Sequence, residues 1–72
     1  MLFNERLRAL RKDKGMKQED AAKALGLNYR HYQRLEAGEN APKFENLLLI
    51  ADFYKVSLDY LAGRTDNREV NP

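Results

Sequence analysis

Apolar residues recur along most of this chain at the three-to-four-residue spacing of helices that bury one face. In residues 2–14 they fall at Phe3, Leu7 and Leu10, which would share one side of a helix. Nowhere do apolar and polar residues alternate over any length, so we expect no strands. The pattern predicts an all-α fold, a compact bundle of about five short helices.

Glycine and capping residues divide this pattern into segments. Glycine commonly follows the end of a helix because it adopts positive φ readily, and Asn or Ser favours a helix start because its side chain accepts from a free backbone N–H. We expect helices over residues 2–14, 18–25, 28–36, from Pro42 onward, and 57–62, with Gly15, Gly26, Gly38 and Gly63 closing the first, second, third and fifth.

The same spacing indicates which side chains face the core. The inward residues expected beyond the first helix are Ala21, Ala22, Leu25, Tyr32, Leu35, Phe44, Leu47, Leu48 and Ala51. We expect residues 1–66 to form one domain. Residues 67–72 contain a single apolar residue, Val70, so we expect them to be a flexible C-terminal tail.

Composition argues against several classes of protein. The 72 residues include no cysteine and one histidine, so no metal site and no cofactor are expected. There is no glycine-rich phosphate loop and no convergent acid, base and nucleophile, which argues against an enzyme. No apolar run approaches the roughly 18 residues that a membrane helix needs. The mixed charge of residues 1–15 does not resemble a signal peptide, so we expect a cytoplasmic protein without a membrane contact.

Charge is distributed unevenly along the chain. Residues 1–34 hold nine Lys and Arg against four Asp and Glu, a net charge of +5, whereas residues 35–72 hold four against seven, a net of −3. Such asymmetry favours a polyanionic partner for the N-terminal half. A solvated surface of mixed charge would show the same counts, so charge alone leaves both interpretations open.

The third predicted helix has an unusual outward face. At about 100° per residue, its long polar side chains fall within one arc, opposite Tyr32 and Leu35. These outward residues are Tyr29, Arg30, Gln33 and Arg34. Amide and guanidinium groups pair with base edges in the major groove of DNA. We therefore expect these four residues to read bases; the alternative is a solvated helix face.

The start of the second predicted helix suggests a phosphate contact. Lys17 is a poor capping residue, and its charge is unfavourable beside the positive end of a helix dipole. A phosphate at the free N–H groups would relieve both problems. Alternatively, Asp20 completes the cap and Lys17 points into water.

The segment "QEDAAKALGLNYRHYQRLEA", residues 18–37, resembles the helix-turn-helix of the phage repressor and Cro-like (Xre) family. In that resemblance Ala22 is the small residue where two helices touch, Gly26 forms the turn, and Leu27 and Leu35 close the pair. The resemblance covers roughly residues 3–66 and includes "SLDYLAGRTDN" as the closing segment. It implies a lambda-repressor-like DNA-binding domain. This chain has Lys17 where the family usually has Ser or Thr, and Tyr32 where it usually has Ile or Val.

The resemblance adds residues to the expected DNA contact. It implies that Gln18 contacts phosphate, and it supports Tyr29 and Arg30 as base readers. It also implies phosphate or minor-groove contacts from the loop that carries Asn40 and Lys43. His31 lies on the flank of the third helix, where a contact with the DNA backbone or a plain surface position is open.

Together these features predict a sequence-specific transcriptional regulator that binds double-stranded operator DNA. We expect it to act as a repressor. Because one short reading helix covers few base pairs, we expect a homodimer on an inverted repeat. Its apolar contact candidates are Leu49, Tyr54, Leu58 and Tyr60. The alternatives are an antitoxin-like or anti-repressor-like module that binds protein, and the DNA-binding fragment of a longer regulator.

Overall fold

The computed structural model describes residues 2–69. It contains five helices and, within this range, no strand, which confirms the predicted all-α class. The helices are α1 (Phe3–Asp13), α2 (Gln18–Leu25), α3 (Tyr29–Ala37), α4 (Phe44–Tyr54) and α5 (Leu58–Leu61). The boundaries differ from the sequence expectation mainly at α4, which begins at Phe44 because Lys43 has an extended backbone as N-cap.

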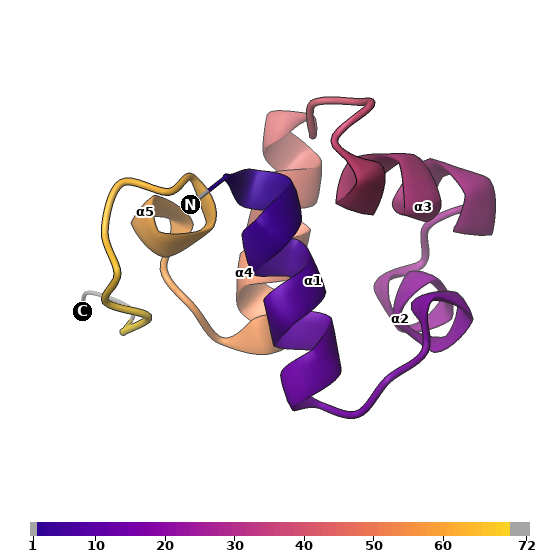
Figure 1. The fold of residues 1–72 in the computed structure, drawn as a ribbon, viewed down its shortest axis with the longest axis horizontal. Helices are drawn as coiled ribbons and strands as arrows, with labels where there is room; N and C mark the ends of the chain where they lie inside the picture. The colour runs from indigo at the N-terminus through magenta and orange to yellow at the C-terminus, as the bar shows by residue number, and fades with distance from the viewer. Residues whose placement is uncertain (1, 70–72) are drawn as a thin grey trace.

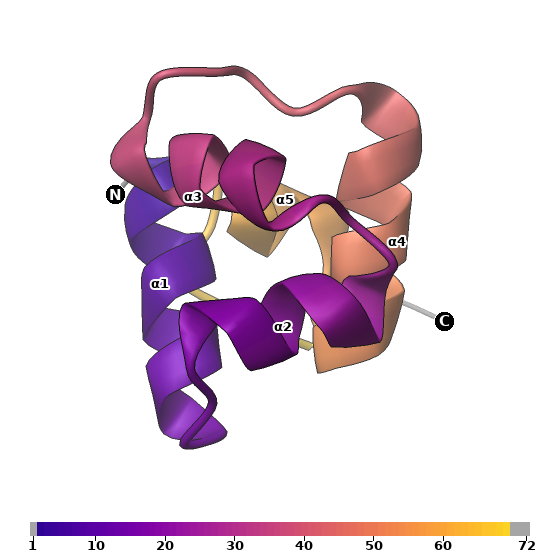
Figure 2. The ribbon, with the colours of Figure 1, turned by 90° about the vertical axis from the view of Figure 1, so that its right-hand side faces the viewer.

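The helices α1 and α4 stand at the centre of the molecule (Figure 1). The pair α2 and α3 lies on one side of them, and the short α5 lies on the other. Figure 2 shows α3 above α2, both lying across the front of the bundle, with the 38–43 loop running from α3 to α4. The two predicted motif helices therefore form one outer face of the domain.

A tight turn joins α2 to α3. Gly26 has φ +71°, a conformation that costs a residue with a side chain more than it costs glycine, and Leu27 N–H donates to the Ala22 carbonyl at 2.9 Å. Asn28 then caps α3, since its side-chain oxygen accepts from the His31 N–H at 3.2 Å. Ala22 is buried beneath the turn, and its small side chain lets the helices approach closely. The helix-turn-helix geometry predicted for residues 18–37 is confirmed.

All five helices contribute side chains to the core. The predicted inward residues of the first three helices are buried, except Phe3, which is half-buried. The buried apolar side chains are Leu7, Leu10, Ala21, Ala22, Leu25, Tyr32, Leu35, Ile50, Ala51, Tyr54, Val56, Tyr60 and Leu61.

The predicted inner face of α4 was partly wrong. Ala51 is buried and Leu47 half-buried, but Phe44 is 67% exposed and Leu48 40% exposed. Ile50 and Tyr54 are buried beside Ala51. The run Leu47–Ile50 is apolar at every position, so two adjacent helix faces have nearly equal apolar spacing. The helices packed against α4 decide between them, and the sequence of α4 does not contain that information.

A buried ion pair joins α1 to α3. The Glu36 side chain is 1% exposed and accepts two hydrogen bonds from Arg11, Nε to Oε2 at 2.7 Å and Nη2 to Oε1 at 3.1 Å. Gln18 Nε2 donates a third at 3.2 Å. Arg11 also donates to the Met16 carbonyl, and Arg8 donates to the Glu36 carbonyl at 3.3 Å. A buried carboxylate is tolerated when charge and hydrogen bonds compensate its lost hydration, and this one has both.

The ionisation of the cluster follows from these contacts. Burial alone would raise the pKa of Glu36, but the hydrogen bonds from Arg11 and Gln18 and the charge of Arg11 outweigh it, so the pKa lies below its ordinary value. Burial raises the pKa of the neighbouring Tyr32, and the Glu36 charge raises it further. The hydroxyls of Tyr32 and Tyr54 are buried without a hydrogen-bond partner among residues 2–69. Both phenols therefore remain neutral beside the charged pair.

The end of α3 packs closely against the start of α1. Gly38 has φ +78°, and a side chain at this position would meet the Asn4 amide at 3.3 Å. The backbone conformation thus favours glycine here, and any other residue would also press on the Asn4 side chain.

Residues after α5 fold back over α1 and α5. Arg6 is buried, with its guanidinium 4.1 Å from the centre of the Tyr60 ring, and it donates to the Thr65 carbonyl at 3.0 Å and to Asp66 at 2.7 Å. Arg68 donates to the Tyr60 hydroxyl at 3.1 Å, and its carbonyl accepts from the Ser57 N–H. Asn67 and Arg68 of the predicted tail are therefore hydrogen-bonded to the domain, whereas Glu69 N–H donates only to the Asn67 side chain; residues 70–72 lie outside the described range.

Two of the residues expected at the dimer contact are buried, so that expectation was wrong for them. Tyr54 and Tyr60 are 7% and 6% exposed, so neither offers a surface to a partner. Tyr54 packs edge-on against Phe53, and Tyr60 is covered by Arg6 and Arg68. The spacing of apolar residues within one helix could not show that Phe53, Arg6 and Arg68 cover these two rings.

We expect Glu36→Gln to lower the free energy of unfolding by about 3 kcal/mol at neutral pH, because it leaves Arg11 without its charged partner. The folded-state pKa of Glu36 is lowered from 4.5. Its charge therefore contributes stability that is present above that value and lost as the pH falls through the folded-state pKa. Denaturant titrations should show the difference between wild type and variant shrinking in acid. The control is Glu39→Gln, an exposed carboxylate; equal stability of all three proteins at pH 7 would contradict the assignment.

Candidate nucleic-acid interface

The outward face of α3 carries all four side chains predicted to read bases. Arg30, Gln33 and Arg34 are exposed, and Tyr29 is 44% exposed. Tyr32 and Leu35 on the opposite side are fully buried. The predicted division of α3 into a packed face and a polar face is confirmed. Two guanidinium groups and one amide, with no carboxylate among the four residues, form a surface suited to an electronegative partner.

The start of α2 lies beside this face. Lys17 is the exposed N-cap residue of α2, with φ −79° and ψ 159°, and its side chain makes no capping hydrogen bond. Gln18 is half-buried and reaches α3 through two contacts, donating to Glu36 and accepting from Gln33 Nε2 at 3.5 Å. The structure thus brings Lys17 and Gln18 next to the outward face of α3.

The remaining candidates lie around this centre. His31 is half-buried on the flank of α3, and its backbone N–H is taken by the Asn28 cap. Asn40 and Lys43 are exposed in the loop after α3 (Figure 2). Lys43 is the N-cap of α4 and makes no capping hydrogen bond with its side chain. None of these three makes a side-chain hydrogen bond to the face of α3 within residues 2–69.

Sequence reasoning missed the residues that hold α3 in place. Arg8, Arg11 and Glu36 were not singled out, although they fix α3 on α1. One signal existed: Glu36 falls on the same side of α3 as Tyr32, where a carboxylate would have to be paired. Its partners Gln18, Arg11 and Arg8 lie 18, 25 and 28 residues away in the chain, and only the folded arrangement identifies them.

Two further findings concern other kinds of site. Within residues 2–69, no three His, Cys, Asp or Glu residues come together in a way that could hold a metal ion. In the same range, every helix is too short or too polar to cross a membrane.

Comparison with known proteins supports the geometry. A helix-turn-helix family model matches residues 7–61. The chain is 39% identical over 64 residues to the cryptic phage CTXphi transcriptional repressor RstR of Vibrio cholerae serotype O1, a match that covers 89% of this chain and 57% of that protein. It is 35% identical over 66 residues to the HTH-type transcriptional regulator YobD of Bacillus subtilis, covering 92% of this chain and 59% of that protein. The chain therefore spans somewhat over half the length of these relatives.

A solved structure shows the same fold. The P22 c2 repressor in its complex with synthetic operator 9T aligns with a TM-score of 0.82 and 32% identity, over 90% of this chain and 98% of that one. The family match covers most of the chain, and the aligned region includes the turn at Gly26 and both helices around it. As the pattern of residues 18–37 predicted, the chain belongs to the Xre-type family of helix-turn-helix proteins.

Proposed function

We propose that this chain binds a specific site in double-stranded DNA and regulates transcription as a repressor. The observation that carries the proposal is the exposed face of α3, where Tyr29, Arg30, Gln33 and Arg34 include no carboxylate and Gln33 contacts Gln18 at the start of α2. The relatives named as transcriptional repressors, and the fold shared with the P22 c2 repressor bound to its operator, support it. The proposed activity is binding, without catalysis or a cofactor, and it takes place in the cytoplasm.

In this proposal α3 enters the major groove. Arg30 and Arg34 carry forked guanidinium groups that match guanine, and the Gln33 amide matches adenine. Tyr29 at the start of α3 packs its ring on a thymine methyl group or donates its hydroxyl to a phosphate. The buried Tyr32 and Leu35 hold the other side of the helix in the core, so the readers are presented from a rigid support.

Phosphate contacts surround the reading helix in this proposal. Lys17 and Gln18 bring a cation and free N–H groups to the start of α2, where a phosphate is favoured by the helix dipole. Asn40 and Lys43 approach the backbone from the loop after α3, and His31 does so from the flank. These contacts orient the domain on any duplex, whereas the base readers select the sequence.

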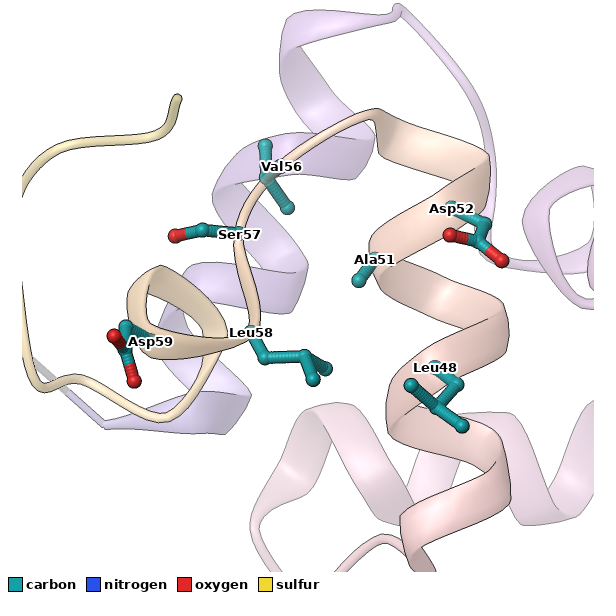
Figure 3. Close-up of a pocket in the computed structure, with 7 residues that line it drawn as sticks. All are labelled: Leu48, Ala51, Asp52, Val56, Ser57, Leu58 and Asp59. Carbon is teal, nitrogen blue, oxygen red and sulfur yellow. The ribbon is translucent and has the colours of Figure 1, made fainter. Parts of the chain in front are cut away.

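We propose further that two copies bind an inverted repeat. A single module of this kind buries roughly 600–1,000 Å², less than most tight specific sites require. The contact between copies would use the acidic C-terminal half, where Leu48, Leu49 and Leu58 are between 37% and 40% exposed. Figure 3 shows Leu48 on α4 and Leu58 at the start of α5 lining one groove, with Asp52 and Asp59 at its edges. The residues that line this groove belong to α4, α5 and the segment between them, and none belongs to α2 or α3.

The first test concerns the phosphate contacts. We expect Lys17→Ala and Lys43→Ala each to weaken binding to every duplex alike and to lower the slope of log affinity against log salt by about one. Arg64→Ala is the matched control, because it removes one exposed charge near α5, on the far side of the bundle. Fluorescence anisotropy over a salt series measures all three. A module that binds protein would show almost no salt-dependent affinity for mixed duplex DNA.

The second test concerns the base readers. We expect Arg30→Ala or Arg34→Ala to cost about 1–3 kcal/mol on the selected site and to relax preference at one base pair each. Selection from a random duplex library, repeated with each variant and with Arg64→Ala, gives both the site and the change. If the double variant Arg30→Ala/Arg34→Ala selects the wild-type sequence with unchanged preference, α3 is not the reading helix.

The third test concerns assembly. On the selected operator we expect a footprint with two half-sites about 34–36 Å apart. Leu49→Asn removes apolar contact without changing charge and should lower the cooperativity of filling by about 1 kcal/mol. One asymmetric footprint, saturated at one copy per duplex, would exclude the paired arrangement. Undiminished cooperativity of Leu49→Asn would exclude only that contact.

A further inference from the structure

A chain of hydrogen bonds leads from the buried ion pair to the outward face of α3. Arg11 donates to Glu36, Gln18 Nε2 donates to Glu36 Oε1 at 3.2 Å, and Gln33 Nε2 donates to Gln18 Oε1 at 3.5 Å. The four residues belong to α1, α3 and α2, and the last of them stands among the proposed base readers. Among residues 2–69, Gln33 is the one outward residue of α3 whose side chain is hydrogen-bonded within the protein.

The chemistry of the first link sets the direction of the others. An ionised carboxylate only accepts hydrogen bonds, so Gln18 must turn its NH₂ group toward Glu36. Its carbonyl oxygen then faces Gln33, which in turn must present an N–H. An amide that could otherwise rotate by half a turn is thereby held in one orientation at each step.

We propose that Glu36 is a positioning residue for base recognition, which acts through Gln18 to fix the direction of the Gln33 amide on the reading face. The inference rests on the proposed function, because it assigns to Gln33 a base contact in DNA. Glu36 touches no nucleotide in this scheme. Its part is to decide which end of the Gln33 amide is left free.

The lowered pKa of Glu36 supports the scheme, because the carboxylate remains an acceptor throughout the neutral range. The half-buried position of Gln18 supports it as well, since a side chain packed between α2 and α3 has few other partners. After donating one N–H to Gln18, Gln33 keeps its carbonyl oxygen and its second N–H. This acceptor and donor are the pair that adenine N6 and N7 require.

The link can be tested in the free protein by the side-chain amide resonances of Gln18 and Gln33. We expect Glu36→Gln to shift the resonances of both glutamines, because an amide at position 36 can donate as well as accept. In a Gln18→Met background, the same change at position 36 should no longer move the Gln33 resonances. Arg34→Met, on the same face but outside the chain of hydrogen bonds, is the control and should leave both amides in place. If Glu36→Gln folds poorly, the test can still be made with Gln18→Met, which leaves the ion pair intact. Gln18→Met alone must then shift the Gln33 resonances.

The consequence for recognition is tested on the selected operator. Gln33→Met identifies its base pair by a loss of preference there of roughly tenfold. We expect Gln18→Met to lose part of the same preference, at the same base pair, and the double variant to lose no more than Gln33→Met alone. The effect of Arg34→Met should instead add to that of Gln18→Met.

The outcomes separate the two proposals. If the amides are independent of each other, or if Gln18→Met weakens all sequences equally, Gln18 is a phosphate contact alone and the positioning role is overturned while DNA recognition stands. If the wild-type protein selects no duplex, the proposed function fails, and the specificity role of Glu36 fails with it even where the amides are coupled.

Discussion

The ion pair between Arg11 and Glu36 is the constraint on which the geometry of the domain depends. A carboxylate that is 1% exposed can stay charged only while its partners remain in place. Those partners come from α1 and from the first residue of α2, so the charge of one side chain ties three helices together. Apolar contacts hold these helices in the core but tolerate small shifts, whereas a two-point contact from Arg11 fixes both position and angle.

The exposed face of α3 derives its order from that arrangement. A domain of this size buries only about 60% of its unfolded surface, which leaves a modest core to orient a helix. Tyr32 and Leu35 anchor one side of α3, Arg8 and Asn4 approach its C-terminal end, and Asn28 caps its start. Helix α3 is therefore supported along its whole length, although most of its outward side chains have no hydrogen-bond partner among residues 2–69.

The sequence predicted those parts of the structure that depend on local pattern. The faces of α3 could be assigned because Tyr32 and Leu35 are its only large apolar residues after Tyr29, and the turn because Gly26 sits between two amphipathic segments. The phase of α4 could not, because Leu47–Ile50 is apolar at every position. The structural role of Glu36 was missed because it depends on an ion pair with Arg11, a residue that only the fold brings near it. The contacts of Asn67 and Arg68, beyond the expected end of the domain at residue 66, were missed because they are polar and absent from any hydrophobic pattern.

The segment after α5 extends the packed part of the chain beyond the last helix. Arg6 is buried under Tyr60 and finds its acceptors at Thr65 and Asp66, beyond the last helix. A fragment cut at Gly63 would keep every helix and still leave a buried guanidinium without acceptors. The fragment would then keep the helical content of the longer chain but have a lower free energy of unfolding, because α1 has lost part of its support. In dissecting or fusing proteins of this type, the polar contact of Arg68, the last one to the core within residues 2–69, is a better boundary than the last helical residue.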